Sequence, residues 1–134
     1  MIPLPVQRGR ANPLEGGAEA ISMASRLELR RYRDVPRFLL AALRLRQQFG
    51  DARGSVQLRL AARPMRRSFF TASIWKDRAA LDDFVQTARH AEVMEQFGPL
   101  LTRSDFRTWV IPAHGPLPGL RESLAHLSDT SLDG

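Results

Sequence analysis

Residues 67–99 read RSFFTASIWKDRAALDDFVQTARHAEVMEQFGP and join a strand pattern to a helix pattern. The first part has an apolar or aromatic side chain at nearly every second position, and this period of two predicts a strand. Its two faces hold Phe69, Thr71, Ser73 and Trp75 on one side and Phe70, Ala72 and Ile74 on the other. Because both faces carry large apolar groups, we expect a central strand that is covered on both sides. Asp77 is then placed to cap the helix that follows.

The helix after Asp77 has a break in its apolar pattern. Its first half places Leu81, Phe84, Val85 and Ala88 on one face, and its second half places His90, Val93, Met94 and Phe97 on the opposite face. One amphipathic helix does not bury two opposite faces. We therefore expect a kink or a restart near residues 87–89, with His90 at the start of the second piece. The alternative is a straight helix whose far side contacts another subunit.

The rest of the chain supplies three more strands and one more helix. Alternating patterns predict strands over 21–30, 55–63 and 106–111. A helix is predicted over 34–50, with Asp34 as its cap and Pro36 in its first turn. The order is βαββαβ, which predicts an α+β, ferredoxin-like fold in which two helices cover one face of a four-stranded antiparallel sheet.

This pattern divides the chain into three parts. The folded domain is expected over residues 20–112. Residues 1–19 are rich in proline and glycine and show no periodicity, so we expect a flexible arm there. Residues 113–134 are expected to form a flexible tail, with one weak helical turn around 120–127.

Composition limits the class of protein. Hydrophobic residues make up 43% of the 134 residues and charged residues 25%, as in a soluble globular domain. No apolar run is long enough to span a membrane, and the N-terminus lacks the apolar core of a secretory signal. The chain has no cysteine, which excludes disulfides and thiolate metal sites and agrees with a cytoplasmic location. The net charge of +6 comes mostly from dispersed arginines, so it gives no run of basic residues for nucleic acid.

The two sheet faces are expected to differ in character. The face under the helices is expected to hold Met23, Leu27, Leu29, Val56, Leu58, Leu60, Phe70, Ala72 and Ile74. The open face is expected to hold Arg26, Glu28, Gln57, Arg59, Phe69, Thr71, Ser73, Trp75, Arg107 and Trp109. Two tryptophans on an open face form an apolar patch that needs a cover. We expect a homodimer in which two such sheets enclose a barrel cavity; the alternative is a dry interface without a pocket.

The sequence resembles a known superfamily at these positions. The segment SFFTASIWKDRAALDDFV, followed by ARHAEVMEQF, is similar to the strand–helix core of the dimeric α+β barrel proteins, which include antibiotic-biosynthesis monooxygenases and spheroidene-monooxygenase-like proteins. The resemblance rests on Trp75, on the helix start from Asp77 to Phe84, on His90 and on Trp109. It implies a homodimeric fold and, in some members, oxidation of small aromatic substrates with no cofactor or with haem. Arg89 stands where such proteins often have a proline.

Several residues are candidates for chemistry. His90 is the candidate catalytic residue, because imidazole exchanges protons near neutral pH and can also ligate haem iron; the alternative is a packing role at the helix break. The candidate substrate-binding residues are Phe69, Thr71, Ser73, Trp75, Trp109, Arg26, Arg59 and Arg107. The tryptophans would wall a flat ligand or form core, and the arginines would bind a carboxylate, a phenolate or haem propionates or stay solvated. We find no metal-binding spacing.

Three functions compete at this point. The first is a monooxygenase-like oxidoreductase that deprotonates a small aromatic or conjugated substrate and lets the carbanion react with oxygen, either without a cofactor or with haem. The second is a non-catalytic dimer that binds a small ligand or haem. The third is an RNA-binding domain of the same strand order, which is disfavoured because the first strand has no aromatic residue and the third has no glycine.

Overall fold

The computed structural model describes residues 1–12, 14, 17 and 19–127, apart from the side chains of residues 88 and 89. Within these residues one antiparallel sheet contains β1 (Ile2–Pro3), β2 (Gln7–Arg8), β3 (Glu19–Leu29), β4 (Ser55–Arg63), β5 (Ser68–Trp75) and β6 (Leu101–Pro112). The α-helices are α1 (Val35–Asp51), α2 (Arg78–Val85), α3 (Ala88–Phe97) and α4 (Leu120–Leu124). Short 3₁₀ turns cover Tyr32–Asp34, Pro64–Arg66 and Gly98–Leu100.

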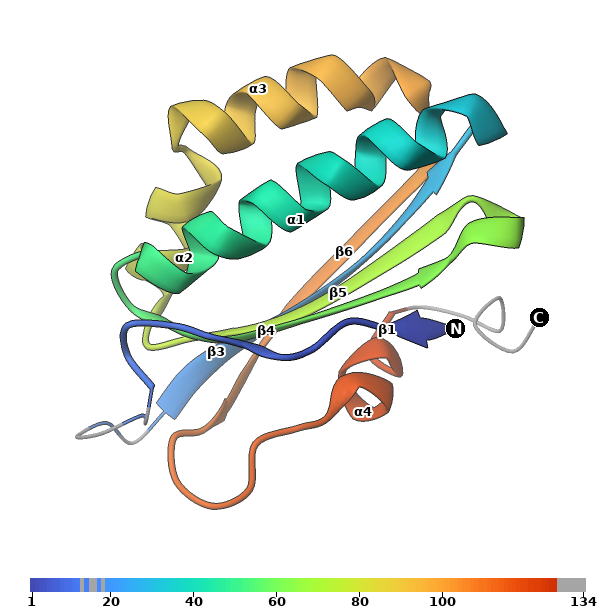
Figure 1. Cartoon of the computed structure of the whole chain (residues 1–134). Helices are drawn as coiled ribbons and strands as arrows, with labels where there is room; N and C mark the ends of the chain where they lie inside the picture. The colour runs from blue at the N-terminus through green and yellow to red at the C-terminus, as the bar shows by residue number, and fades with distance from the viewer. Residues whose placement is uncertain (13, 15–16, 18, 128–134) are drawn as a thin grey trace.

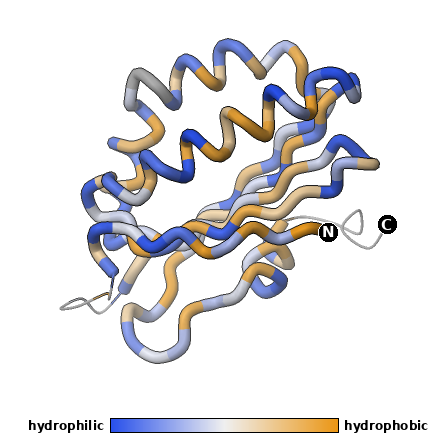
Figure 2. The backbone as a smooth tube through the Cα atoms, in the orientation of Figure 1, coloured by the Kyte–Doolittle hydropathy of each residue, from blue (hydrophilic) through white to orange (hydrophobic). Residues whose placement is uncertain are grey.

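The strand order is β1-β4-β5-β3-β6, and β2 also pairs with β4. From β3 to β6 the chain follows the predicted βαββαβ order, so the α+β, ferredoxin-like arrangement is confirmed, with two short strands added at one edge. Helices α1, α2 and α3 lie over one face of the sheet, and α4 lies over the other (Figure 1). Hydrophilic and hydrophobic residues alternate along α1 and α3, as expected for amphipathic helices on a sheet (Figure 2).

The helix starts follow the predicted capping chemistry in one case and depart from it in another. The Asp77 side chain accepts a hydrogen bond from the Ala80 N–H at 2.9 Å and caps α2 as predicted. Asp34 makes no such bond at the start of α1. Its carboxylate lies 3.9 Å from the Arg37 guanidinium instead, so the predicted capping role of Asp34 is wrong.

The predicted helix break is confirmed. Helix α2 ends at Val85, and α3 begins at Ala88 after the cap residue Thr87. The Thr87 side chain accepts a hydrogen bond from the His90 N–H at 3.4 Å. This restart turns the apolar side of α3 toward the sheet, where Phe97 is buried.

Gly54 brings the start of β4 against α2. Its φ of 79° lies in the left-handed region, and a Cβ atom there would lie 2.4 Å from the Ala80 Cβ. The Lys76 N–H donates to the Gly54 carbonyl at 2.7 Å. Glycine is therefore required both by the backbone conformation and by the close approach of Ala80.

The faces of β5 are the reverse of the prediction. Antiparallel partners share a face, and Ser73 pairs with Met23 on β3 and with Leu58 on β4. Phe69, Thr71, Ser73 and Trp75 therefore lie on the helix face, the side of the sheet under α1, α2 and α3. Phe70, Ala72 and Ile74 lie on the outer face, the side toward α4. Val56 also packs on the outer face, against Ile74 and Ile111, because the ladder between β4 and β5 shifts register after Ser55.

The outer face is covered by the two terminal parts of the chain. Leu124 and Leu127, in and just after α4, pack on Phe70, and the exposed fractions of these three side chains are 3%, 5% and 1%. The His126 ring stacks on the Trp109 ring at 3.7 Å between centroids. Ala11, Leu14 and Leu117 pack against the cluster that contains Val56 and Ile74.

The described terminal segments, for which the sequence predicts a flexible arm and a flexible tail, thus pack against the sheet. Residues 2–3 and 7–8 pair with β4, and the Gly9 N–H donates to the Val56 carbonyl at 2.9 Å. The division of the chain at residues 19 and 112 remains a prediction, and residues 128–134 lie outside the described part. Among the described helices, none has the length and apolarity needed to cross a membrane.

Candidate functional site

A cavity of about 130 Å³ lies between the helix layer and the helix face of the sheet. Its floor comes from β3, β4 and β5, and its walls come from α1, α2 and α3. Aromatic side chains supply much of the lining: Phe38, Phe49, Phe69, Trp75, Phe84 and Phe97. The cavity forms because the amphipathic helices and the sheet both turn apolar side chains inward, which is the usual lining of a small-molecule site.

Trp75 is the centre of the aromatic wall. It is almost fully buried, and its ring centroid lies 5.0 Å from that of Phe49 and 5.2 Å from that of Phe84. The Phe84 ring in turn lies 5.7 Å from the His90 ring. These edge and tilted contacts fix the wall, because aromatic pairs prefer such geometries.

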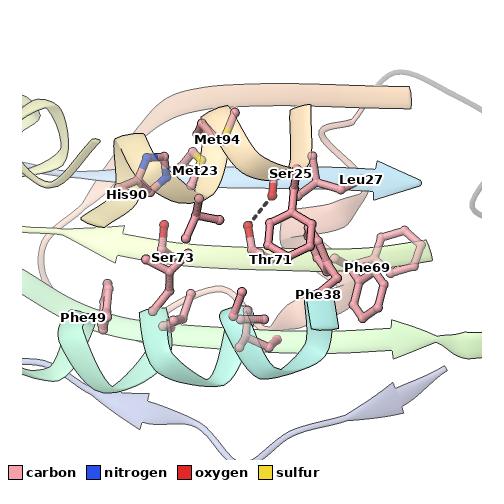
Figure 3. Close-up of a pocket in the computed structure, with 18 of the residues that line it drawn as sticks. Met23, Ser25, Leu27, Phe38, Phe49, Phe69, Thr71, Ser73, His90 and Met94 are labelled. Atoms are coloured by element: carbon pink, nitrogen blue, oxygen red, sulfur yellow. Dashed lines mark hydrogen bonds between the residues drawn. The ribbon is translucent and has the colours of Figure 1, made fainter. Parts of the chain in front are cut away.

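Three hydroxyl groups break the apolar floor of the cavity. The side chains of Ser25 on β3 and Thr71 on β5 share a hydrogen bond across the two strands (Figure 3). The Trp75 Nε1–H donates to Ser73 Oγ at 3.0 Å. Ser25, Thr71 and Ser73 all line the cavity, so they present polar groups to anything that enters it.

His90 lies at one end of the same cavity, near Met23 and Met94 (Figure 3). Its Nδ1 atom is buried and has no hydrogen-bond partner among the described residues. Burial lowers the pKa of His90 below its usual value of 6.5. A hydrogen bond with the Val85 backbone raises the pKa by a smaller amount. The imidazole is therefore neutral at pH 7 and has a nitrogen available to accept a proton.

The cavity opens at one side. Val85, Met94 and Phe106 line it and are also exposed, with exposed fractions of 44%, 38% and 50%. Phe106 lies on β6, which is an edge strand. The opening therefore lies between this edge of the sheet and the α2–α3 segment, beside His90.

The structure brings together five of the predicted site residues and separates the other four. Phe69, Thr71, Ser73, Trp75 and His90 all line the cavity. Arg26, Arg59, Arg107 and Trp109 lie on the outer face, since they pair or cluster with its residues. These five residues line a cavity between helices and sheet, because the register of β5 turns its hydroxyls and Trp75 toward the helices; a cavity between the two sheets of a dimer remains a prediction.

The predicted arginine cluster makes other contacts. The Arg26 guanidinium pairs with the Glu28 carboxylate at 3.1 Å, and its Cζ lies 5.8 Å from the Phe70 centroid. Arg26 is buried on the outer face and does not line the cavity. Arg26, Arg59 and Arg107 therefore do not share the cavity with Trp75, and ligand binding by these arginines remains a prediction.

Sequence reasoning also missed several lining residues. Ser25 was not singled out, although it has the same parity as Met23 and Leu27 on the first strand. Met23 was assigned to the core, and it lines the cavity together with Phe38 and Phe49 of neighbouring elements. Alternation along the first strand could have identified these residues. Met23, Ser25 and Leu27 occupy alternate positions on one face, so all three line a cavity on that face.

The sequence matches no protein-family model and no curated protein. Similar solved structures do exist. SnoaB, a cofactor-independent oxygenase from Streptomyces nogalater, is 16% identical with a TM-score of 0.57, over 76% of this chain and 100% of that chain. A proposed antibiotic biosynthesis monooxygenase from Nitrosomonas europaea is 10% identical with a TM-score of 0.60, over 74% and 94%. The chain shares the fold of these two proteins.

Another solved structure with this fold is larger. A proposed monooxygenase from Lactobacillus acidophilus NCFM is 13% identical with a TM-score of 0.64, over 81% of this chain and 49% of that chain. The chain described here thus spans about half the length of that protein. At identities of 10% to 16%, these likenesses establish the fold and leave the activity to be argued from the site.

The sequence resemblance described above implies haem as one alternative, and the residues that line the cavity offer only part of what haem requires. His90 offers a nitrogen for iron. However, no arginine or lysine lines the cavity among the described residues, and the predicted arginine partners of the propionates lie on the outer face. The residues therefore fit haem poorly. Within the described residues, no group of three or more histidine, aspartate or glutamate side chains is placed to hold a metal ion.

Proposed function

We propose that this protein is a monooxygenase-like oxidoreductase that acts on a small aromatic or conjugated substrate in the cavity under α1, α2 and α3, with no cofactor. The observation that carries the proposal is the unpartnered Nδ1 of His90 beside an aromatic wall. An apolar cavity favours the uncharged substrate, and a neutral imidazole at its edge can remove a proton from it. The fold shared with SnoaB supports the proposal, since that protein is a cofactor-independent oxygenase.

The proposed reaction begins with a proton transfer. His90 takes a proton from an acidic methylene of the substrate, R₂CH₂, and leaves a carbanion delocalised over the adjoining rings. The carbanion reduces O₂ and forms a C–O bond, and the peroxide regains a proton from the imidazolium to give R₂CH–OOH. Loss of water then gives R₂C=O. The balance is R₂CH₂ + O₂ → R₂C=O + H₂O, so O₂ is the only oxidant required.

Oxygen uptake tests the proposal directly. The purified protein is mixed with one- to three-ring aromatic compounds that carry an acidic methylene, and oxygen consumption is followed with an electrode. His90→Gln is expected to lower the rate by about 100-fold or more, the usual contribution of a general base. His114→Gln is the matched control, because His114 is exposed and lies outside the cavity. No uptake above buffer with the wild-type protein, or equal uptake by both variants, contradicts the proposed role of His90.

The second candidate is ligand binding without turnover. Trp75 lines the cavity, so a bound aromatic compound is expected to quench its fluorescence whether or not chemistry follows. Quenching without oxygen uptake favours this candidate. A haem-binding version predicts a Soret band after addition of hemin that shifts in His90→Ala.

The homodimer remains a prediction. Its original basis, two tryptophans on one open face, does not hold, because Trp75 lies on the helix face and Trp109 lies beneath His126. Part of the outer face is covered by α4 in the same chain. A dimer that uses this face would need α4 to move or to form part of the interface.

A further inference from the structure

We propose that Ser25, Thr71 and Ser73 form a hydrogen-bond-donating floor that selects ligands with an acceptor oxygen, such as an aryl ketone, over hydrocarbons of the same shape. This inference deepens the proposed function and rests on it for one point, that a small aromatic ligand enters this cavity. It concerns binding and does not require turnover.

The first step counts the protons of the Ser25–Thr71 pair. Each hydroxyl has one proton to donate and two lone pairs to accept. The pair shares one hydrogen bond, which uses one proton. The oxygen that accepts in this bond still carries its own proton, and no other acceptor contacts either hydroxyl among the described residues. Whichever residue donates, the pair keeps one unused donor.

The second step concerns Ser73. Its oxygen accepts from the Trp75 Nε1–H, so the indole occupies one lone pair and leaves the Ser73 proton free. This bond also orients the side chain, because the serine and the tryptophan stand two residues apart on one face of β5. Ser73 is 2% exposed, so its donor faces the interior of the protein.

The third step is the surroundings of these donors. The neighbouring lining is apolar and comes from residues such as Met23, Leu58 and Leu60. The other unpaired polar atom of the lining is Nδ1 of His90, which is an acceptor in the neutral imidazole when the proton is on Nε2. We therefore expect a bound ligand to place its acceptor oxygen against the three hydroxyl groups and its acidic C–H bond toward His90.

The size of the cavity limits the ligand. An apolar cavity of about 150 Å³ is known to take one benzene molecule. The cavity here is about 130 Å³ and has an opening, so a single ring with a short substituent fits its enclosed part. A hydrocarbon of that size leaves the hydroxyl donors unpaired, whereas a ketone pairs with at least one of them. An unpaired buried donor is costly, so the floor discriminates between the two.

The experiment compares two probes of similar size. In acetophenone a carbonyl oxygen takes the place of one methyl group and the benzylic hydrogen of isopropylbenzene. Dissociation constants are measured from the fluorescence of Trp75 in a Trp109→Phe background, so that one tryptophan reports. The measured quantity is the ratio of the isopropylbenzene to the acetophenone dissociation constant, which cancels general effects of a substitution on the cavity.

The expected result is a loss of discrimination. The double variant Ser25→Ala/Thr71→Val is expected to lower this ratio by about tenfold, and Ser73→Ala by about threefold to tenfold. Thr71→Ser keeps the hydroxyl and is expected to keep the ratio. Ser22→Ala is the matched control, because Ser22 is a buried serine on the same strand that faces the outer side. Circular dichroism of each variant confirms that it is folded.

The outcomes separate the two proposals. An unchanged ratio in the double variant and in Ser73→Ala overturns the hydroxyl floor and leaves ligand binding intact. If neither probe binds the wild-type protein, the hydroxyl floor is overturned, whereas the proposed function is overturned only if the oxygen-uptake assay also shows no activity with any of its substrates. A ratio that falls as expected without oxygen uptake supports the floor and contradicts only the enzymatic proposal.

Discussion

Helix α4 is short, yet its packing against the outer face of the sheet is expected to contribute strongly to the free energy of unfolding. Leu124 is the residue that tests this, because it is 3% exposed and packs on Phe70 together with Leu127. The substitution Leu124→Ala removes most of its buried side chain and preserves the helix, since alanine is the best helix former.

The expected loss follows from burial and from the cavity left behind. Buried leucine-to-alanine changes cost about 2 to 5 kcal/mol, and the lower end applies where the surroundings can close. Because α4 lies at the protein surface and can move toward the sheet, we expect about 2 to 3 kcal/mol. For a chain of 134 residues this corresponds to a decrease in Tm of about 6 to 12 °C.

Urea unfolding followed by circular dichroism measures the free-energy change, and a thermal scan measures the Tm. Leu40→Ala is the matched control, because Leu40 is a helical leucine that is 50% exposed. It is expected to change the free energy of unfolding by less than about 0.5 kcal/mol. If Leu124→Ala behaves like Leu40→Ala, α4 contributes little to stability, and this reasoning about its packing on the sheet is refuted.

Three further predictions concern the pH dependence of stability, the requirement for Gly54 and the oligomeric state. Burial lowers the pKa of His90 in the folded state, so the unfolded chain binds a proton first as the pH falls. The free energy of unfolding should therefore decrease below about pH 6.5 and level off below the pKa of the folded state. Urea midpoints measured between pH 5 and 8 should show this decrease in the wild-type protein and not in His90→Gln. Gly54→Ala should destabilise the protein by at least about 1 kcal/mol more than Gly115→Ala. Both glycines have a positive φ, but only at position 54 would the added Cβ clash with Ala80. Equal unfolding midpoints for the two variants would refute this reasoning. Light scattering at micromolar concentration should show a homodimer, and a monomer mass at all concentrations would remove that prediction.

The fold was predictable because its signals are local. Alternation defined four strands, and the phase change between Phe84 and Val93 correctly indicated the break that separates α2 from α3. The position of His90 follows from that break, since the restart directs its ring toward the cavity. These features depend on residues close in sequence, where periodicity carries the information.

The face of β5 was not predictable in the same way. Both of its sides are largely apolar, so alternation shows that there are two sets and does not show which set faces the helices. The pairing of Ser73 with Met23 and Leu58 decides this, and register is a property of three strands rather than one. The reversed assignment of the β5 faces places Trp75 on the same face as Arg26, whereas the structure places Trp75 in the cavity under the helices. The docking of α4 was missed because a segment with so few apolar residues shows no clear period.

The position of β6 has a consequence for the order in which this protein folds. Residue Glu19 on β3 pairs with Pro112 on β6, so this ladder joins the two ends of the domain, whereas β4 and β5 are joined by a short turn. Closing a long loop before its contacts form is slow. We therefore expect the β4–β5 hairpin to form early and the β3–β6 ladder to form late. On the ribosome, the strand that borders the cavity opening would emerge after the β4–β5 hairpin, and the cavity would stay incomplete until then.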